Sequence, residues 1–368
     1  MRIGLVKEIK KEEYRVGLTP VSAHEYVLNG HEVMVEAGAG NGVGFKDSDY
    51  EDYGCSIVSD KKRLFDAADM VIKVKEPLEE EYELFHEGQI LYAYLHLAAE
   101  KKLTEALLKA QVTAVAYETV TEADGSLPLL IPMSQVAGRL SVQEGAKYLE
   151  KFFGGRGVLL GGVPGINKGK VLIIGGGIAG KNACKIAVGM GADVTIMDIS
   201  SKRLAELDDL FGNSVKTLYS NSYNLKAAIA DADLIIGAVL IPGAIAPKLI
   251  KHNDLKLMKK GAVLVDIAID QGGCFETSKP TYHSNPTYIV DGIVHYCVAN
   301  MPGAVSLSST YALTSVTNRY GVMIANQGID NALSQMQIKT GLNCMNGKLT
   351  NKAVADAHSM DYLLEPYK

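Results

Sequence analysis

Residues 171–180 of this 368-residue chain read VLIIGGGIAG, and an acidic residue, Asp198, follows 18 positions after Gly180. The four apolar residues before the glycines predict a buried parallel strand, and the segment after them has the apolar period of a helix. A second short apolar run, 194–197, then ends at Asp198. This order of strand, glycine turn, helix and strand predicts half of a doubly wound α/β sheet.

Each glycine of this turn has a physical role. Gly175 permits the tight turn, Gly177 lets a pyrophosphate approach the backbone, and Gly180 lets helix and strand pack closely. The N–H groups at the start of the helix, around Ile178 and Ala179, are available to phosphates. The alternative is a glycine-rich turn that binds nothing, because the chain has 37 glycines and about 0.4 chance matches are expected.

Asp198 bears on which dinucleotide would bind. Its carboxylate can accept hydrogen bonds from ribose hydroxyls and disfavours a 2′-phosphate, which argues for NAD. Arg203 lies nearby and could accommodate that phosphate. Use of NADP therefore stays an open alternative.

The composition limits the class of protein. Hydrophobic residues make up 47% of the chain and charged residues 21%, with a net charge of −5. These values are typical of a globular protein, and neither nucleic acid nor a membrane is an expected partner. The five scattered cysteines favour reduced thiols over disulfides or a zinc site. The early charges at Lys7 and Glu8 argue against a signal peptide, so we expect a cytoplasmic protein.

Short apolar runs alternate with helical or loop segments along most of the chain, as expected for two Rossmann-like, doubly wound α/β domains joined by long helices. We expect a discontinuous substrate (catalytic) domain from 1–130 and 305–368, and an NAD-binding Rossmann domain from 131–304. A long helix is expected at about 134–153. The expected strands are 3–6, 32–36, 70–74, 90–95, 112–116, 171–174, 194–197, 215–219, 234–237 and 262–265.

Polar residues follow several of these strands, where open parallel sheets bind ligands. Arg15 lies in the loop after the first strand, Lys75 after 70–74, and His96 after 90–95. Asp266 and Asp270 follow 262–265 in the second domain. Cations on one domain and acids on the other would surround a small anionic substrate in a cleft between the domains.

Each candidate also has an ordinary structural interpretation. Arg15 and Lys75 have charged neighbours and could belong to solvated surface clusters. His96 could be a core histidine, and Asp270 could cap the next segment. Glu118 also ends a strand, and we interpret it as a surface carboxylate. Cys274 is expected to be a packed thiol.

Several motifs together resemble the alanine dehydrogenase and transhydrogenase alpha-subunit family, and in particular the bacterial L-alanine dehydrogenases. The resemblance covers essentially the whole chain. It is carried by these segments: Lys7-Glu8, Glu13 to Pro20 (EYRVGLTP), Val74 to Pro77 (VKEP), Tyr94 to His96 (YLH), Ile131 to Ser134 (IPMS), Val171 to Asp198, Asp266 to Cys274 (DIAIDQGGC) and Val298 to Gly303 (VANMPG).

The resemblance implies NAD-dependent, reversible oxidative deamination of L-alanine to pyruvate and ammonium by hydride transfer through an imine. Arg15 and Lys75 would bind the substrate, and His96 and Asp270 would be the catalytic acid/base pair. Relatives are usually homohexamers. The residues that would bind NAD are Ser134, Gly175, Gly177, Ile178, Ala179, Gly180, Asp198, Arg203, Ser220, Val239, Leu240, Ile267, Ile269, Lys279, Val298, Asn300 and Met301.

Two positions depart from the pattern of that family. Lys279 stands where many relatives carry an arginine, and a lysine lacks the bidentate fork of a guanidinium. Gln327 stands where some relatives have a histidine implicated in metal binding, so no metal site is predicted. Two alternatives share the nucleotide-binding motif: a transhydrogenase-like NAD-binding subunit, and an NAD-sensing protein without amino-acid chemistry.

Overall fold

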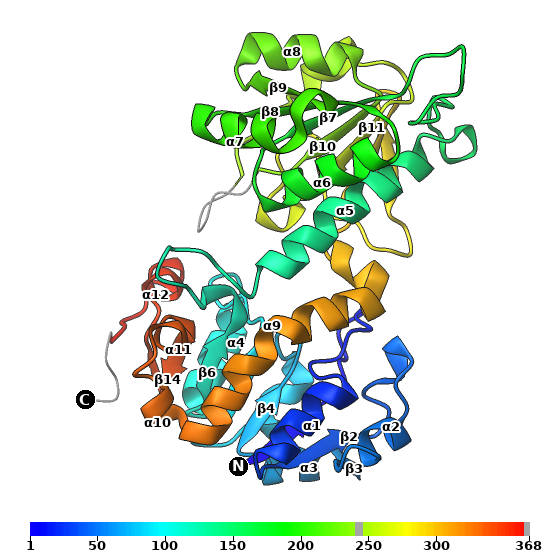
Figure 1. Ribbon diagram of the computed structural model, residues 1–368. Coiled ribbons are helices and arrows are strands. Elements are labelled where there is room, and N and C mark those ends of the chain that lie inside the picture. Colours follow the sequence, from blue (N-terminus) through cyan, green and yellow to red (C-terminus); the bar gives the residue numbers. More distant parts are fainter. Residues whose placement is uncertain (240–245, 364–368) are drawn as a thin grey trace. The chain divides into compact units, whose positions relative to one another are not determined.

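A computed structural model describes residues 1–239 and 246–363. The chain divides into two compact units, unit 1 from residues 1–133 and 305–368 and unit 2 from residues 134–304. The chain passes from one unit to the other inside the helix α5 (Ile131–Tyr148) and again inside the short 3-10 helix η8 (Met301–Val305) (Figure 1).

Unit 1 is built on an eight-stranded sheet in the order β15-β14-β6-β5-β4-β1-β2-β3. The first six strands in the chain pair in parallel, whereas β14 and β15 add an antiparallel edge. The chain winds outward from β1 in both directions, so the sheet is doubly wound as expected. The strands are β1 (Arg2–Leu5), β2 (Glu32–Glu36), β3 (Ser56–Val58), β4 (Met70–Ile72), β5 (Ile90–Ala93), β6 (Thr113–Ala116), β14 (Leu342–Met345) and β15 (Lys348–Leu349).

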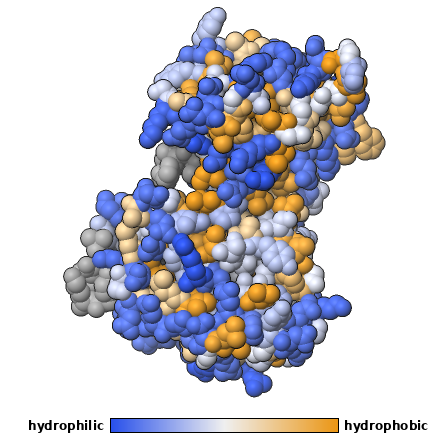
Figure 2. Space-filling view, viewed as in Figure 1, coloured by the Kyte–Doolittle hydropathy of each residue, from blue (hydrophilic) through white to orange (hydrophobic). Residues whose placement is uncertain are grey.

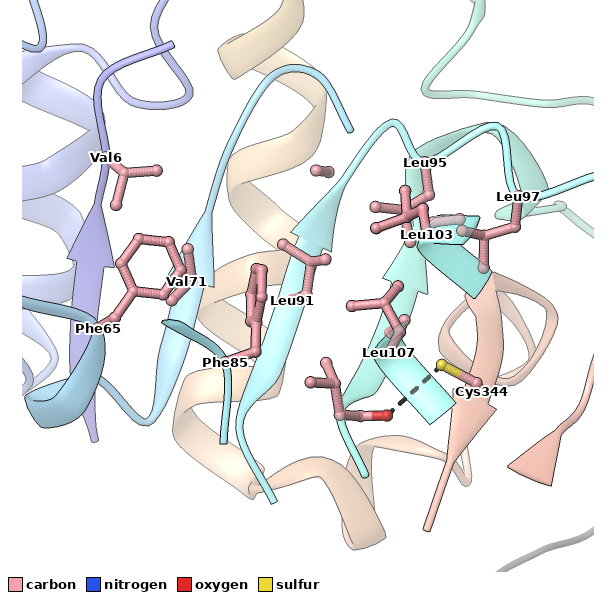
Figure 3. Packing of buried hydrophobic residues seen from close by; sticks show 14 of the residues in the cluster. Val6, Phe65, Val71, Phe85, Leu91, Leu95, Leu97, Leu103, Leu107 and Cys344 are labelled. Atoms are coloured by element: carbon pink, nitrogen blue, oxygen red, sulfur yellow. Dashed lines mark hydrogen bonds between the residues drawn. The ribbon is translucent and has the colours of Figure 1, made fainter. Parts of the chain in front are cut away.

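Helices cover both faces of this sheet because successive strand residues point to opposite sides. On one face, Leu91 of β5 belongs to an apolar cluster with Phe65 and Leu107 from two helices (Figure 3). On the other face, the hydroxyl of Tyr92 donates to the carbonyl of Thr317, 3.0 Å away. The helices are α1 (Pro20–Leu28), α2 (Asp47–Glu51), α3 (Lys61–Ala67), α4 (Lys101–Lys109), α9 (Ser306–Gln327), α10 (Ile329–Ala332), α11 (Met336–Gly341) and α12 (Lys352–His358), with the 3-10 helices η1 (Asn41–Val43), η2 (Glu79–Leu84) and η3 (Tyr117–Thr119).

Unit 2 contains a seven-stranded sheet in the order β12-β13-β11-β10-β7-β8-β9. All its strand pairs are parallel except β12 with β13. The order reverses between β7 and β10, and ligands of doubly wound sheets bind at the carboxyl ends of the strands at such a point. The strands are β7 (Lys170–Ile174), β8 (Asp193–Asp198), β9 (Val215–Tyr219), β10 (Leu234–Gly237), β11 (Val263–Asp266), β12 (Thr287–Val290) and β13 (Ile293–Tyr296).

Alternating strand residues also divide the core of unit 2 into two layers. Leu172 and Leu264 pack with Ile229 of α8 on one face. Ile173 lies against the N-terminal turn of α6 on the other face, where Gly180 approaches it closely. The helices are α6 (Ile178–Gly189), α7 (Ser201–Phe211) and α8 (Ser222–Asp231), with the 3-10 helices η4 (Lys151–Phe153), η5 (Gly212–Ser214), η6 (His252–Leu257) and η7 (Ile269–Gln271).

The two sheets and their helix layers confirm the predicted α/β fold class, but some boundaries were wrong. The helix expected at 134–153 is α5, which begins at Ile131 and ends at Tyr148. Pro132 fits its first turn because that position needs no N–H partner. After Tyr148 the chain turns through Gly154, which has a φ of 89°. Among the described residues, no helix is both long and apolar enough to cross a membrane.

Candidate active site

Three of the predicted site residues follow neighbouring strands of unit 1. Arg15 lies in the loop after β1, Lys75 follows β4, and His96 follows β5. These strands are adjacent and parallel in the order β5-β4-β1, so their carboxyl ends share one edge of the sheet. Unit 1 therefore brings two cations and an imidazole to the same edge.

Arg15 is held rigidly by a neighbouring carboxylate. Its Nε donates to Glu13 Oε1 at 2.7 Å and its Nη2 donates to Glu13 Oε2 at 2.6 Å, a bidentate ion pair. The third nitrogen, Nη1, lies 3.1 Å from the sulfur of Met133. Burial opposes the positive charge, but Glu13 outweighs it and raises the pKa of Arg15. This guanidinium is a permanent, oriented cation.

The backbone at Lys75 is anchored by Glu8, which follows β1. Glu8 Oε1 accepts from the N–H of Val74 at 2.6 Å and from that of Lys75 at 3.3 Å. The other oxygen of Glu8 lies 3.5 Å from Nζ of Lys73, whose side chain is fully buried and also bonds Glu81 at 3.0 Å. Burial raises the pKa of Glu8, although the Lys73 charge opposes the shift.

Glu76 connects the charges at this edge. Burial works to raise the pKa of Glu76, but the charge of Lys75, the hydrogen bond and charge of Lys10, and the charge of His96 lower it below its usual value. A carboxylate can respond to all three side chains only if they lie near it. Lys75 and His96 therefore belong to one electrostatic neighbourhood.

His96 has an exposed side chain and a backbone φ of 50°. Its ring stacks on that of Tyr94, with the ring centres 6.2 Å apart and the planes 13° from parallel. The Tyr94 hydroxyl donates to the carbonyl of Leu129 at 2.6 Å, which fixes the stacking partner. The N–H of His96 donates to Glu118 Oε1 at 2.6 Å. The interpretation of Glu118 as a surface carboxylate was wrong, because its side chain is half-buried and binds this loop.

In unit 2, the glycine turn joins β7 to α6 as predicted from the sequence. Gly175 has a φ of 103°, in the region that favours glycine. A Cβ on Gly180 would lie 1.8 Å from the carbonyl oxygen of Gly175, whereas a Cβ on Gly177 would meet nothing within 4 Å. Gly177 caps the helix and is exposed with Ile178, so the backbone here is open to a ligand.

Asp198 ends β8 and stabilises the turn. One carboxylate oxygen accepts from the N–H of Gly176 at 2.7 Å and the other from that of Ser200 at 2.8 Å. A carboxylate offers about four lone-pair sites, so two ribose hydroxyls could still bind. Arg203 donates to the carbonyl of Gly176 at 2.6 Å and to Glu206 at 2.6 Å. Arg203 therefore stabilises the glycine turn, and its charge is paired with that of Glu206.

The other residues predicted to bind NAD mostly follow the remaining strands of unit 2. Ser220 follows β9, Val239 follows β10, and Ile267 with Ile269 follows β11, whereas Ser134 lies in α5. Leu240 lies outside the described residues. Three further candidates come shortly after β13, namely Val298, Asn300 and Met301. Lys279 lies before β12, with its Nζ 4.5 Å from the ring centre of Tyr288.

Asp270 lies in η7 of unit 2 and is exposed. The loop that carries it is anchored by Asp266, which accepts from the N–H of Ala268 at 3.1 Å and from that of Cys274 at 2.9 Å. The Ser278 hydroxyl donates to the same carboxylate at 2.5 Å. Burial raises the pKa of Asp266, and these hydrogen bonds oppose the shift. Cys274 is a buried thiol, as expected for packing.

Sequence reasoning did not identify the carboxylates that anchor these loops. Glu8 and Glu13 stood within segments already noted for their resemblance, but only as neighbours of other candidates, whereas Asp266 was expected at a strand end as a possible ligand-facing acid and not as a loop anchor. The sequence offered one signal for them: Glu8 and Asp266 lie at or shortly after the end of a strand, and Glu13 lies two residues from Arg15. Within the described residues, no group of three His, Cys, Asp or Glu side chains could hold a metal ion.

The fold and these residues define a two-unit α/β protein with a nucleotide-binding Rossmann-type turn. Two family models match almost the whole chain, alanine dehydrogenase/PNT N-terminal domain over residues 4–137 and alanine dehydrogenase/PNT C-terminal domain over residues 141–352. The chain therefore belongs to the alanine dehydrogenase/PNT family.

Similar proteins agree with this family. An alanine dehydrogenase of Methanococcus maripaludis and alanine dehydrogenase 2 of Staphylococcus aureus are each 56% identical over 364 residues, 98% of this chain and of their own. A solved L-alanine dehydrogenase superposes with a TM-score of 0.95 at 51% identity, covering 98% of this chain and 99% of its own. A transhydrogenase from Sinorhizobium meliloti shares the fold alone, with a TM-score of 0.83 at 23% identity, covering 96% and 100%.

Proposed function

We propose that the protein catalyses the NAD-dependent, reversible oxidative deamination of L-alanine to pyruvate and ammonium. The observation that carries this proposal is the shared sheet edge of Arg15, Lys75 and His96. These groups supply an anion-binding cation, a second cation and an acid/base catalyst. They occur in a chain that is similar to alanine dehydrogenases over nearly its full length.

The residues of unit 2 fit a dinucleotide. The backbone at Gly177 is open where a pyrophosphate would approach, and α6 begins there with its N–H groups. Asp198 keeps lone pairs for ribose hydroxyls, and a 2′-phosphate would meet its negative charge. These features favour NAD as the cofactor, and the other strand-end residues of unit 2 are proposed to bind it as well.

In the proposed reaction, L-alanine, NAD⁺ and water give pyruvate, ammonium, NADH and a proton. NAD, when bound, accepts the hydride that leaves Cα of alanine. Arg15 binds the alanine carboxylate, and Glu13 holds the guanidinium in place so that little side-chain entropy is lost on binding. Lys75 stabilises the negative charge that develops on the carbinolamine oxygen as its hydroxyl proton is lost.

His96 and Asp270 are the proposed acid/base pair. Loss of the hydride from Cα and of one proton from the ammonium group gives 2-iminopropanoate in its protonated, iminium form. His96 takes a proton from the water that attacks the imine carbon and returns that proton to the nitrogen of the carbinolamine. As the C–N bond breaks, the departing ammonia takes the proton of the carbinolamine hydroxyl and leaves as ammonium. Asp270 stabilises the positive charge on the departing nitrogen.

The test is the absorbance of NADH at 340 nm. Addition of pyruvate and ammonium to protein with NADH should give a steady decrease that requires both substrates. Binding of NADH without any decrease would favour an NAD-sensing protein or a transhydrogenase-like subunit. Glyoxylate and longer 2-oxo acids in the same assay show which side-chain sizes the substrate pocket accepts. One methylene changes the discrimination between substrates by only about 1–3 kcal/mol, so activity on neighbouring oxo acids is expected.

Cofactor choice is tested by comparing NADH with NADPH. Asp198 opposes a 2′-phosphate, and Arg203 is already bound by Glu206 and by the Gly176 carbonyl. We therefore expect kcat/KM to favour NADH by at least about tenfold. Equal values for the two cofactors would show that Arg203 leaves its partners to bind the phosphate.

We also propose a cytoplasmic homo-oligomer, a hexamer by resemblance to the family. All five cysteines are free and buried, as in proteins of reducing compartments. Unit 2 exposes apolar side chains close together in the sequence, with exposed fractions of 90% at Phe152, 64% at Leu159 and 62% at Ile166. Hydrophobic residues also reach the surface in several places on the face drawn in Figure 2. Mass measured by light scattering tests the oligomer number.

A further inference from the structure

His96 is one of few residues other than glycine with a positive φ. Its φ of 50° lies in the left-handed region, which costs an L-residue about 1 kcal/mol or more when nothing local supports it. The residue is exposed and, among the described residues, only its stacking on Tyr94 is a ring contact, so no enclosing core imposes this conformation. Contacts of the backbone must therefore hold the turn that aims the imidazole.

Within the turn, the carbonyl of His96 accepts from the N–H of Ala99 at 2.9 Å, and Glu118 adds contacts from the next strand of the sheet. It lies in η3, directly after β6, and β6 pairs in parallel with β5. Its Oε1 accepts from the N–H of His96 at 2.6 Å, and both carboxylate oxygens lie 3.2 Å from the N–H of Leu95. One side chain thus binds two consecutive N–H groups at the bend of the loop.

The same arrangement recurs at the neighbouring loop. Glu8 accepts from the consecutive N–H groups of Val74 and Lys75, just as Glu118 does at Leu95 and His96. In both loops the second of the two residues is a candidate for substrate chemistry. The repetition indicates that carboxylates anchor the backbone under the reacting side chains.

We propose that Glu118 is a positioning residue that fixes the left-handed turn at His96 and thereby aims the imidazole at the substrate. The inference rests on the proposed function of His96 as the acid/base catalyst. Glu118 acts through the backbone, because its hydrogen bonds to this loop are accepted from the N–H groups of Leu95 and His96. Its role thus requires an oxygen acceptor at the right distance and requires no negative charge.

Three substitutions of Glu118 distinguish the position of its carboxylate oxygens from its negative charge. Glu118→Gln keeps one oxygen at the same reach and removes the charge, whereas Glu118→Asp keeps the charge and withdraws the oxygens by one methylene. Glu118→Ala removes both. Since a positioned acid/base catalyst contributes about 10²–10⁴ to the rate, we expect Glu118→Asp and Glu118→Ala to lower kcat at least about tenfold. Glu118→Gln should stay within about threefold of the wild type.

Glu122→Ala is the matched control. Glu122 follows in the same segment, and its carboxylate accepts from the Tyr320 hydroxyl at 2.6 Å and from the Gln337 amide at 2.7 Å. Those bonds join unit 1 to its C-terminal helices and involve none of the candidate site residues. This variant should keep the wild-type kcat, so a loss specific to Glu118 reflects the His96 loop.

Two measurements besides turnover address the mechanism. Amide hydrogen exchange in a peptide spanning residues 94–97 should accelerate in Glu118→Asp and Glu118→Ala, and stay slow in Glu118→Gln. The affinity for NADH, measured by calorimetry, should stay unchanged in all three. The pH dependence of kcat/KM should keep its apparent pKa in Glu118→Gln, because the charge of Glu118 is not needed.

The outcomes distinguish this inference from the proposed function. High activity in Glu118→Asp with loss in Glu118→Gln would overturn positioning and assign Glu118 an electrostatic role. Wild-type exchange at residues 94–97 in Glu118→Ala would overturn it as well. If the wild-type protein shows no turnover with pyruvate and ammonium, the proposed function fails, and the exchange pattern still decides whether Glu118 holds the turn.

Discussion

Three glycines of the helix α6 allow ligand binding to be separated from folding by single substitutions. Gly180→Ala places a methyl group 1.8 Å from the carbonyl oxygen of Gly175 and 3.3 Å from Cγ2 of Ile173. Because real Cβ atoms stay at least 3.0 Å from such atoms, the two glycines must separate by about 1.2 Å. Gly177→Ala meets nothing within 4 Å, and neither does Gly189→Ala at the far end of the helix.

The expected effects differ in kind. Overpacking at Gly180 should cost about 1–3 kcal/mol of stability, and a unit of this size loses about 2–4 °C of Tm per kcal/mol. Displaced N–H groups should also weaken NADH binding about 10- to 100-fold, since a hydrogen bond to a charged group is worth about 1.5–3 kcal/mol. Gly177→Ala should keep the Tm within about 1 °C and lose the affinity. Gly189→Ala should lower neither the Tm nor the affinity for NADH, and alanine at this helical position should stabilise the protein by about 0.5–1 kcal/mol.

The assays are thermal unfolding without ligand and calorimetric titration with NADH at constant protein concentration. The decisive comparison is Gly177→Ala. If this variant binds NADH as tightly as the wild type, no pyrophosphate approaches the turn and the proposed cofactor site is wrong. If Gly180→Ala keeps both its Tm and its affinity, the close approach of α6 to β7 is not needed for either.

Three further perturbations test the candidate residues and the core. His96→Ala should bind NADH normally but keep less than about a tenth of the wild-type kcat, and greater retention would remove His96 from the acid/base role. Lys73→Met leaves the buried carboxylates of Glu8 and Glu81 without the cation that they share, so urea unfolding should show a free energy of unfolding lower by about 3–5 kcal/mol. In the control, Lys102→Met, the lost ion pair is exposed, and the free energy of unfolding should fall by less than about 1 kcal/mol. Burial raises the pKa of Cys184 and of Cys344 to about 12 from 9.0; the folded state thus keeps protons that the unfolded state loses, and stability that is complete below pH 9 should fall as the pH rises towards 12. A Tm that is constant from pH 9 to 11 would contradict this.

The sequence predicted the parallel strands well because their signal is local. The strands β2, β9 and β10 have the predicted bounds, and others differ by a few residues at their ends. β10 is a short apolar run with the pattern of a strand buried on both faces, β2 has an apolar centre between two glutamates, and β9 mixes apolar and polar residues. The glycine turn and Asp198 were found for the same reason, since their spacing is fixed within one strand–helix–strand unit.

Two of the strands that the sequence analysis missed, β3 and β14, have weaker or non-local signals. β3 has three residues and is not fully buried, so it lacks a distinct apolar pattern. β14 is only four residues long, LNCM, with the polar Asn343 inside it, and segments this short do not distinguish strand from helix. Its partner is β6, more than 220 residues earlier in the chain, and no local pattern predicts such a pairing.

The anchoring carboxylates were missed for a different physical reason. A glutamate in a sequence gives no indication of whether its oxygens bind water or backbone N–H groups. Glu118 acquires its role only because parallel pairing of β5 with β6 brings it beside the loop that carries His96. Strand order is a tertiary property, so the second layer of this site required the structure.

The interrupted path of unit 1 has a consequence for how the protein is made. The cluster around Leu91 and Leu107 is completed by Cys344, Leu349 and Val354, which a ribosome adds more than 220 residues after β6. During translation, unit 2 can fold as soon as it emerges, while β6 of unit 1 waits with an unpaired edge. The nascent chain therefore carries an open, apolar sheet until β14 and α12 have been synthesised, and a chain that stops before them leaves this sheet exposed to aggregation.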